Sequence, residues 1–194
     1  IATEQFAPIN RLTDLQEPEF DGVTVHLPAQ TPLALQAFSD AGLMGASKPA
    51  DIGGMQLPTV VEMASMSFFY KASVSLAAYP MLTRGNANTI LAHGTPKQIA
   101  AFAKPGFAGT TFGTMCLSEP QAGSSLSDIA TRAESDGADF EADPLGARYR
   151  LKGNKMWISS GDHELTENIV HLVLAKIPGP DGKLIPGVKG ISLF

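Results

Sequence analysis

The sequence contains almost no cysteine and has little clustered charge. Its one cysteine, Cys116, excludes an internal disulfide, and the four histidines show no zinc-type spacing with it or with one another. The net charge of −5 includes no basic run, which argues against a nucleic-acid partner because such binding needs clustered Lys and Arg. No apolar stretch reaches the roughly eighteen residues of a membrane span, and the first residues do not resemble a secretory signal. We therefore expect a cytoplasmic protein without a metal site, a nucleic-acid partner or a membrane segment.

The chain does contain enough apolar sequence to build a core, with 44% hydrophobic residues. Its glycines and prolines lie mostly between apolar runs, where they are typical of turns and caps, so no disordered block is predicted. The first residue is Ile1 rather than Met, and Phe194 lies in an apolar run that resembles an unfinished strand. These ends lead us to expect a fragment of a longer protein.

The first third of the chain is predicted to be irregular and then helical. Residues 1–30 have no sustained period and indicate an irregular lead segment. Thr31 before Pro32 supplies an N-cap hydroxyl, and Gly42 can close the same helix in the left-handed conformation. A second helix opens at Pro58, and its apolar stripe is predicted to face the core; the stripe consists of Leu57, Val60, Val61, Ala64 and Phe68.

Two more helices and then strands are expected. A helical run from about Pro80 ends at Gly94, and Thr95-Pro96-Lys97-Gln98 combines a capping box with a first-turn proline. Pro105-Gly106 is predicted to end the helical part. Strand-length apolar runs follow, over residues 110–118, 129–134, 147–152, 169–175 and 188–194. Helices followed by strands indicate an α+β fold, not a parallel α/β sheet.

The segment Met115-Cys116-Leu117-Ser118-Glu119-Pro120-Gln121-Ala122-Gly123-Ser124-Ser125 reads as a strand that ends in a proline and glycine loop. Gly123 allows close backbone approach, and Ser124, Ser125 and exposed N–H groups can bind a diphosphate. Taken alone, the segment is more typical of a glycine-rich hairpin loop, because short Gly/Ser loops are common. A buried, unreactive Cys116 is the favoured interpretation of that residue.

A second segment, Lys155-Met156-Trp157-Ile158-Ser159-Ser160-Gly161, places the only tryptophan beside two hydroxyls. A tryptophan face packs well on a planar heteroaromatic ring, and a hydroxyl can hydrogen-bond to a ring nitrogen. Taken alone, the pattern favours a core tryptophan on a strand. His163 follows Asp162 and suggests a catalytic pair, but a loop or surface position is favoured because neighbours on a strand point to opposite faces.

Together these segments carry a family resemblance. Leu117-Ser118-Glu119-Pro120-x-Ala122-Gly123-Ser124 and Lys152-Gly153-x-Lys155-x-Trp157-Ile158-Ser159 resemble two motifs of the acyl-CoA dehydrogenases, in the same order and at a similar separation. The similarity extends to Gly85-Asn86 and to residues 94–98, and so covers most of residues 31–194. Residues 161–175 look most like the long-form branch, which includes 3-methylmercaptopropionyl-CoA dehydrogenases.

The resemblance implies a truncated fold in three parts. These are the lead segment 1–30, a partial helical amino-terminal domain over residues 31–106, and a partial β-barrel middle domain over residues 107–194. The carboxy-terminal helical domain would be absent.

The resemblance to the acyl-CoA dehydrogenases also implies an FAD site. Met115, Cys116, Leu117 and Ser118 would face the pyrimidine edge of the isoalloxazine, and Gly123 and Ser124 would bind the diphosphate. Ser124 would also contact the acyl-CoA thioester. Further cofactor contacts would come from Trp157, Ile158 and Ser159, with Ser159 donating to flavin N5. The usual Asp after the Gly-Ser pair is Ser125 here, which puts any role of that position in doubt.

The implied reaction is oxidation of an acyl-CoA thioester to the α,β-unsaturated acyl-CoA, with hydride transfer to flavin N5. A glutamate base is expected beyond Phe194, so the chain alone is expected to be inactive, and none of its glutamates is nominated: Glu119, Glu134, Glu141, Glu164 and Glu167. Glu119 is interpreted as a structural carboxylate. The resemblance also implies an electron-transfer flavoprotein partner and a homo-oligomer. A flavin oxidase or monooxygenase, or a non-catalytic DNA-associated relative, stays open as an alternative.

Overall fold

The computed structural model describes residues 1–194. The chain forms two compact units, one made of Ile1–Thr114 with Ser160–Val170 and the other of Met115–Ser159 with His171–Phe194. Helices dominate the first unit and strands the second, so the predicted α+β segregation is confirmed. No helix of the structure is both long and apolar enough to cross a membrane.

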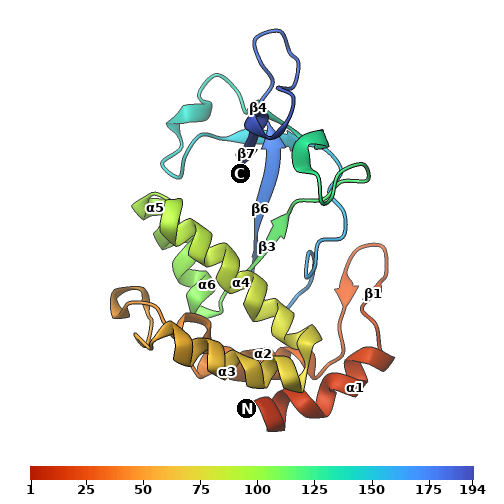
Figure 1. Ribbon diagram of the computed structural model, residues 1–194, viewed down its shortest axis with the longest axis vertical. Helices are drawn as coiled ribbons and strands as arrows, with labels where there is room; N and C mark the ends of the chain where they lie inside the picture. The colour runs from red at the N-terminus through yellow and green to blue at the C-terminus, as the bar shows by residue number, and fades with distance from the viewer. The chain divides into compact units, whose positions relative to one another are not determined.

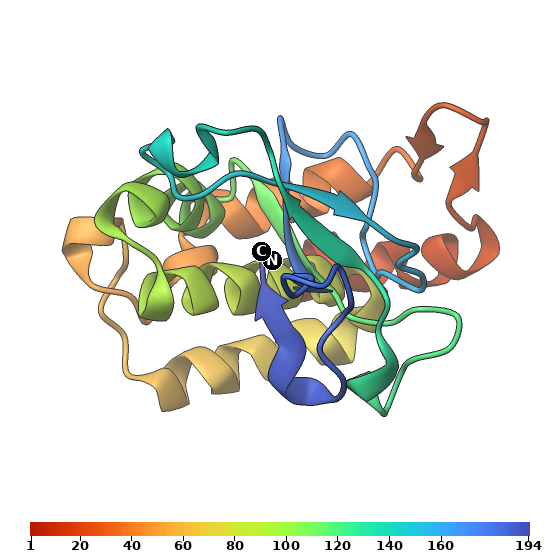
Figure 2. The ribbon, with the colours of Figure 1, turned by 90° about the horizontal axis from the view of Figure 1, so that it is seen from above.

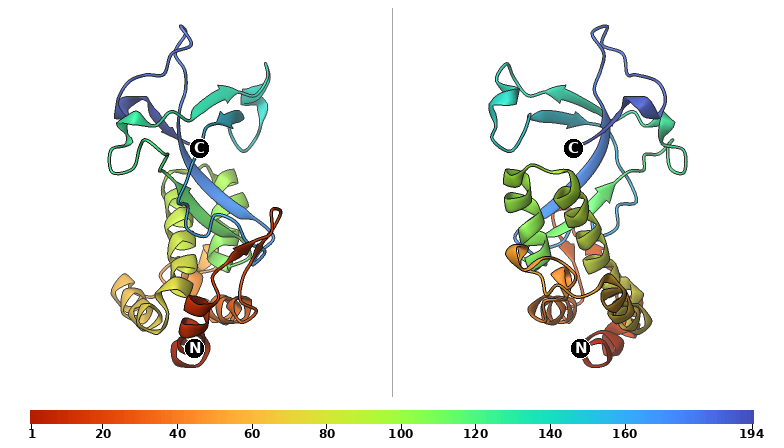
Figure 3. Two further views of the ribbon diagram at one scale, coloured as in Figure 1. Left: turned by 90° about the vertical axis from the view of Figure 1, so that its right-hand side faces the viewer. Right: turned by 60° about the vertical axis from the view of Figure 1, so that its left-hand side comes forward.

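The first unit contains all the α-helices and a short two-stranded ribbon (Figure 1). Its helical elements are η1 (Ala2–Phe6), α1 (Ala7–Leu15), α2 (Thr31–Asp40), η2 (Leu43–Gly45), η3 (Ala50–Ile52), α3 (Thr59–Ala72), α4 (Val74–His93), α5 (Pro96–Gln98), η4 (Ile99–Ala103) and α6 (Lys104–Ala108). The ribbon pairs β1 (Glu19–Phe20) with β2 (Val25–His26) in antiparallel fashion, and it projects from the helices in the left view of Figure 3.

The prediction of an irregular lead segment was wrong for its first half, which is helical. η1 and α1 cover residues 2–15, and Phe6 is fully buried. Its ring lies 5.0 Å from that of Phe69 and 6.2 Å from that of Phe38, centroid to centroid. These contacts bring together residues that are far apart in the sequence, which is why no local period indicated them.

α2 and its glycine stop lie where they were predicted, but the cap differs. Thr31 is the first residue of α2 and its N–H donates to Pro28 O at 2.9 Å, so Thr31 is not the N-cap residue. Its buried hydroxyl has no hydrogen-bond partner. Gly42 follows the helix with φ +70°, the left-handed conformation that was expected there.

The helix α3 begins after Pro58 as predicted, but the opposite face is buried. Val60 and Phe68 are 75% and 66% exposed, so the predicted core stripe was wrong. The buried residues of α3 are Glu62, Met66 and Phe69. Glu62 Oε1 lies 2.6 Å from Arg84 Nη2 on α4, and both side chains are less than 10% exposed. A buried carboxylate needs a partner, so this ion pair helps to set which face of α3 turns inward.

The remaining helix boundaries were predicted in part. α4 ends before Gly94 as expected but begins at Val74, because Ser73 caps it and Pro80 lies inside the helix. The capping box is confirmed: Thr95 Oγ1 accepts from Gln98 N at 3.2 Å, and Gln98 Oε1 accepts from Thr95 N at 2.9 Å.

The predicted break at Pro105-Gly106 was wrong. Helical structure continues through α6 and ends at Gly109, which has φ +75°. The proline is tolerated because it occupies the first turn of α6, where a missing N–H is not needed.

Five strands form a mixed sheet. They are β3 (Phe112–Cys116), β4 (Arg132–Ser135), β5 (Tyr149–Lys152), β6 (Ile169–Lys176) and β7 (Ile191–Leu193), each inside a run predicted as strand or within one residue of it. The order is β3-β6-β4-β5, with β7 also paired to β6. β4 pairs antiparallel with β5, side by side in Figure 2, and parallel with β6.

Helix α4 supplies the polar groups that hold the first residues of β3. Asn86 Nδ2 donates to Thr114 O at 2.9 Å and to Val170 O at 2.8 Å. Thr83 Oγ1 accepts from Gly113 N at 3.1 Å. A Cβ on Gly113 would lie 2.6 Å from the Asn86 side chain, so glycine permits this approach. The start of β3, which leads into the first motif, is therefore fixed by buried hydrogen bonds.

The neighbours Phe68 and Phe69 test which face of α3 is buried. Phe69→Ala should lower the free energy of unfolding by about 3–5 kcal/mol, because it removes a buried ring from the aromatic cluster. Phe68→Ala should cost less than about 1 kcal/mol, because its ring is largely in solvent. Urea unfolding followed by circular dichroism measures both. Equal losses, or a larger loss for Phe68→Ala, would contradict the buried face described here.

Candidate functional site

The first motif ends β3 in a tight turn around a buried carboxylate. Glu119 and Ala122 exchange both main-chain hydrogen bonds, at 2.8 and 3.0 Å. The Glu119 side chain is 3% exposed. Five donors reach it: Gln121 Nε2, Ala130 N, Thr131 N, Thr131 Oγ1 and Lys155 Nζ. The interpretation of Glu119 as a structural carboxylate of its turn agrees with this geometry.

These contacts keep Glu119 ionised although it is buried. Burial raises the pKa of the carboxyl group, but the hydrogen bonds from Lys155, Thr131 and Ala130 outweigh it and lower the pKa from 4.5 to about 2. A Cβ on Gly153 would lie 2.1 Å from Thr131 Oγ1, so Gly153 lets the chain pass close to this network.

Lys155 joins the second motif to the first. Its ammonium donates to Leu117 O at 3.0 Å and to Glu119 Oε1 at 2.8 Å, and its side chain is 12% exposed. Beside it, Met156 N donates to Ser118 O at 3.1 Å. Two stretches separated by more than thirty residues therefore meet within one unit. Lys155 stands in the second motif, but the sequence alone indicates no role for it, because only the fold shows what its ammonium contacts.

Trp157 lies next to this junction and is 74% exposed. It belongs to no strand, so the expectation of a core tryptophan on a strand, which the residue suggested when taken alone, was wrong. Its backbone has φ +59°, a conformation that few residues other than glycine adopt and that costs roughly 1–2 kcal/mol. Because backbone strain of this kind clusters at ligand sites, Trp157 is a candidate contact residue.

The hydroxyl groups of the predicted set are open to a ligand. Ser118, Ser124 and Ser159 form no side-chain hydrogen bond in the structure, and Ser124 and Ser159 are exposed. In contrast, Ser125 Oγ lies 2.9 Å from Ser127 Oγ. Gly123 has open space where a Cβ would stand and no positive φ. The chain itself therefore does not require glycine at position 123.

The other predicted cofactor contacts are only partly accessible. Met115, Leu117 and Ile158 are half-buried, and Cys116 is 7% exposed, in agreement with a buried cysteine. Cys116 Sγ lies 3.9 Å from His171 Nδ1 on β6. The Cys116 side chain is therefore largely closed to a ligand, whereas those of Met115, Leu117 and Ile158 are accessible in part.

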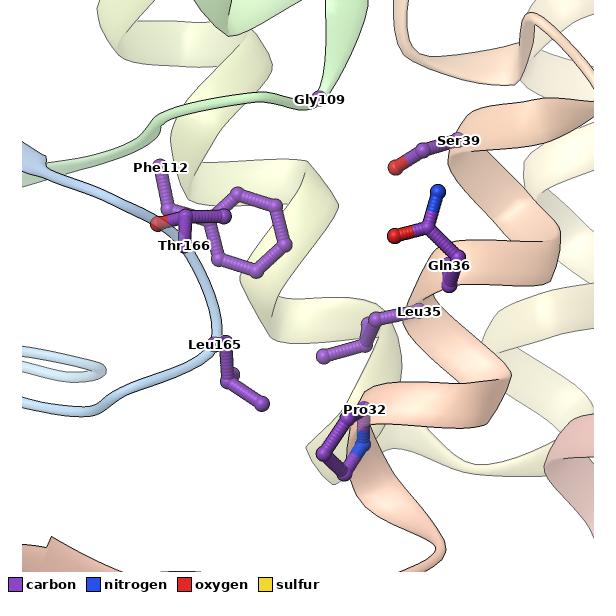
Figure 4. Close-up of a pocket in the computed structure, with 8 residues that line it drawn as sticks. All are labelled: Pro32, Leu35, Gln36, Ser39, Gly109, Phe112, Leu165 and Thr166. Atoms are coloured by element: carbon purple, nitrogen blue, oxygen red, sulfur yellow. The ribbon is translucent and has the colours of Figure 1, made fainter.

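Two other features of the first unit were considered as sites. His163 lies in a loop, as favoured, where it is 6% exposed and packs against the rings of Tyr79 and Phe112. A pocket lies between α2, the first residue of β3 and residues of two loops; Figure 4 shows its lining, which is Pro32, Leu35, Gln36, Ser39, Gly109, Phe112, Leu165 and Thr166. No ionisable side chain lines this pocket, so it offers no acid or base.

Known structures share this fold. The chain superposes along its whole length on 44% of butyryl-CoA dehydrogenase from Megasphaera elsdenii, with a TM-score of 0.75 and 21% identity. It also matches an acyl-CoA dehydrogenase from Bacillus anthracis complexed with FAD, with a TM-score of 0.64 and 25% identity, over 91% of this chain and 26% of that one. The fold is that of an acyl-CoA dehydrogenase.

Sequence comparison identifies the family. Residues 2–110 match the family model of the acyl-CoA dehydrogenase N-terminal domain, and the chain belongs to that family. It is 37% identical to 3-methylmercaptopropionyl-CoA dehydrogenase from Ruegeria pomeroyi over 98% of its length. The resemblance stated from the motifs is thus confirmed. The chain spans 30% of the length of this relative.

The Glu119 network predicts a pH dependence of stability. Because the folded pKa of Glu119 is about 2, below the ordinary value of 4.5, its contribution of about 3 kcal/mol is present above pH 4.5 and is lost as the pH falls toward 2. Glu119→Gln should remove this part of the dependence, whereas Glu141→Gln, at an exposed position of the same unit, should leave it unchanged. Urea unfolding between pH 5 and 2.5 measures the difference, and parallel curves for Glu119→Gln and the unaltered chain would refute the assignment.

Proposed function

We propose that the chain supplies the amino-terminal and middle parts of an FAD-dependent acyl-CoA dehydrogenase. In this proposal Met115, Cys116, Leu117 and Ser118 border the pyrimidine edge of the isoalloxazine, and Trp157 and Ile158 pack against the ring. Ser159 donates a hydrogen bond to flavin N5. Gly123 and Ser124 bind the diphosphate, and Ser124 also contacts the acyl-CoA thioester.

One observation carries the proposal: the two motifs meet at the bond between Met156 N and Ser118 O, 3.1 Å long, with an exposed tryptophan beside it. A planar ring of mixed polarity fits such a place because it can cover the indole face and take hydrogen bonds from nearby hydroxyls. The open space at Gly123 fits a close approach of the diphosphate. The family neighbour that is complexed with FAD adds support.

The reaction that this site would serve needs a base on the other side of the substrate. When bound, FAD accepts the hydride from the β carbon of an acyl-CoA while a base removes the α proton. Glu119 is unsuited to that role because it is buried and held ionised by five donors. We therefore propose that a glutamate beyond Phe194, in a carboxy-terminal helical domain, acts as the base.

The wider assignments follow from the family. We propose that residues 31–106 and 107–194 correspond to the partial amino-terminal and middle domains. An electron-transfer flavoprotein is the proposed electron acceptor, and the full-length protein is proposed to form a homo-oligomer.

Cofactor binding can be measured through Trp157, because it is the only tryptophan of the chain. FAD should quench its fluorescence in a saturable titration, whereas an equal concentration of riboflavin, which lacks the diphosphate, should bind more weakly. Gly123→Asp should weaken FAD binding by about a hundredfold or more, because its carboxylate would repel the diphosphate while the fold, which leaves open space there, stays intact.

Ser125→Asp is the matched control for this substitution. It adds the same charge two residues further on, at the position where the family usually has Asp, and should change the affinity by less than about threefold. Absence of saturable quenching in the unaltered chain would refute FAD binding. Equal effects of the two substitutions would refute the placement of the diphosphate at Gly123.

The activity is tested in the full-length protein that contains this chain. Loaded with FAD and kept anaerobic, it should lose flavin absorbance near 450 nm when a short-chain acyl-CoA is added, since the cofactor takes up the hydride. The 194-residue chain with bound FAD should show no such bleaching because it lacks the proposed base. A full-length protein that binds FAD but does not bleach with any acyl-CoA would refute the proposed activity.

A further inference from the structure

The segment that carries Trp157 has few contacts of its own to hold it. Residues 154–158 belong to no helix, strand or turn. Their one main-chain hydrogen bond is that from Met156 N to Ser118 O. Trp157 itself gains little from packing, since its side chain is 74% exposed, and its left-handed backbone is unfavourable. The direction of the indole ring must therefore depend on side-chain contacts between this segment and other parts of the unit.

The Lys155 side chain is the one strong anchor of this segment. Its ammonium contacts two groups of the first motif, Leu117 O at 3.0 Å and Glu119 Oε1 at 2.8 Å. The side chains of Lys155 and Glu119 are 12% and 3% exposed, so solvent competes little for the bond between them. Glu119 cannot follow a moving Lys155, because four further donors from Gln121, Ala130 and Thr131 hold the carboxylate.

We infer that Lys155 is a positioning residue for the cofactor: its ammonium, bound to Leu117 O and Glu119, fixes the backbone from which Trp157 projects and so orders the aromatic wall of the site before a ligand arrives. This inference rests on the proposed function, because the ligand of that wall is FAD there. Preorganisation of this kind contributes to affinity since the ordering entropy is lost on folding rather than on binding. Lys155 itself touches no cofactor atom in this role.

The charge on Lys155 is needed as well as its length. The carbonyl of Leu117 and the carboxylate of Glu119 are both acceptors, so a neutral apolar side chain between them would leave the Glu119 charge with one donor fewer in a buried place. The consequence should appear first in the weakly anchored residues 154–158. The turn of Glu119 and Ala122 retains its own main-chain bonds.

The experiment compares Lys155→Met with the unaltered 194-residue chain. FAD affinity from Trp157 quenching should fall about tenfold in Lys155→Met, because residues 154–158 would then have to be ordered on binding rather than on folding. Time-resolved fluorescence anisotropy without FAD should show faster local rotation of the indole ring. A role in global stability alone would not change that rotation at temperatures well below the unfolding transition, where circular dichroism confirms the fold.

Lys152→Met is the matched control, since it removes the same charge from an exposed lysine three residues earlier that has no side-chain hydrogen bond in the structure. It should leave both the affinity and the ring rotation unchanged. If Lys155→Met fails to fold, Lys155→Gln, which keeps a shorter neutral donor, should fold and show the same two effects.

The outcomes separate the two proposals. An unaltered chain that does not bind FAD would overturn the proposed function and this inference with it. Normal binding by the unaltered chain, with the same affinity and ring rotation in the folded Lys155 variant, would overturn this inference alone. A loss of affinity that Lys152→Met reproduces would also overturn it, because the effect would then come from net charge.

Discussion

The second unit depends on one buried ion pair, that of Glu119 with Lys155. Removing two charges from water is expensive, and a buried pair repays this only when the remaining hydrogen-bonding positions are filled. Here Gln121, Ala130 and Thr131 fill them around the carboxylate, and Leu117 O takes a second bond from the ammonium. The network connects the end of β3, the start of β4 and the segment before Trp157. A disturbance at any of these places would leave a charge buried without its partners, so the three segments keep their relative positions.

Two residues of the candidate site are not explained by the stability of the fold. Trp157 is large and apolar, yet it is exposed and its backbone is left-handed. Gly123 has neither a positive φ nor a close neighbour that would require glycine. Such conflicts between local preference and observed structure are expected where a sequence serves a ligand rather than its own stability. These two residues lie in the two motifs that carry the family resemblance, and the proposed FAD site would give both a common ligand.

The first unit depends on buried aromatic rings and on a buried ion pair between two helices. Rings of Phe6, Phe38 and Phe69 form an aromatic cluster in its core, and Phe38 lies 4.8 Å from Phe69 in an edge-on arrangement. The ion pair of Glu62 with Arg84 lies between α3 and α4 and turns the polar Glu62 inward. As a result, α3 leaves Val60 and Phe68 on its outer face. Apolar residues at helical spacing thus do not by themselves identify the buried face of a helix when a neighbouring helix carries a charged partner for one of its polar residues.

The sequence by itself determined the features that arise within a few residues. The capping box of Thr95 and Gln98, the left-handed Gly42 and the strand positions follow from side-chain hydrogen bonds, steric limits and local periodicity, and the two motifs were recognisable as written. Only the tertiary structure decided that residues 2–15 are helical, which face of α3 is buried, and that Lys155 joins the motifs. Each of these depends on a partner distant in the sequence, such as Phe69, Arg84 or Glu119. A local pattern carries no information about such a partner, because burial and charge pairing are settled by which segments the whole chain brings together.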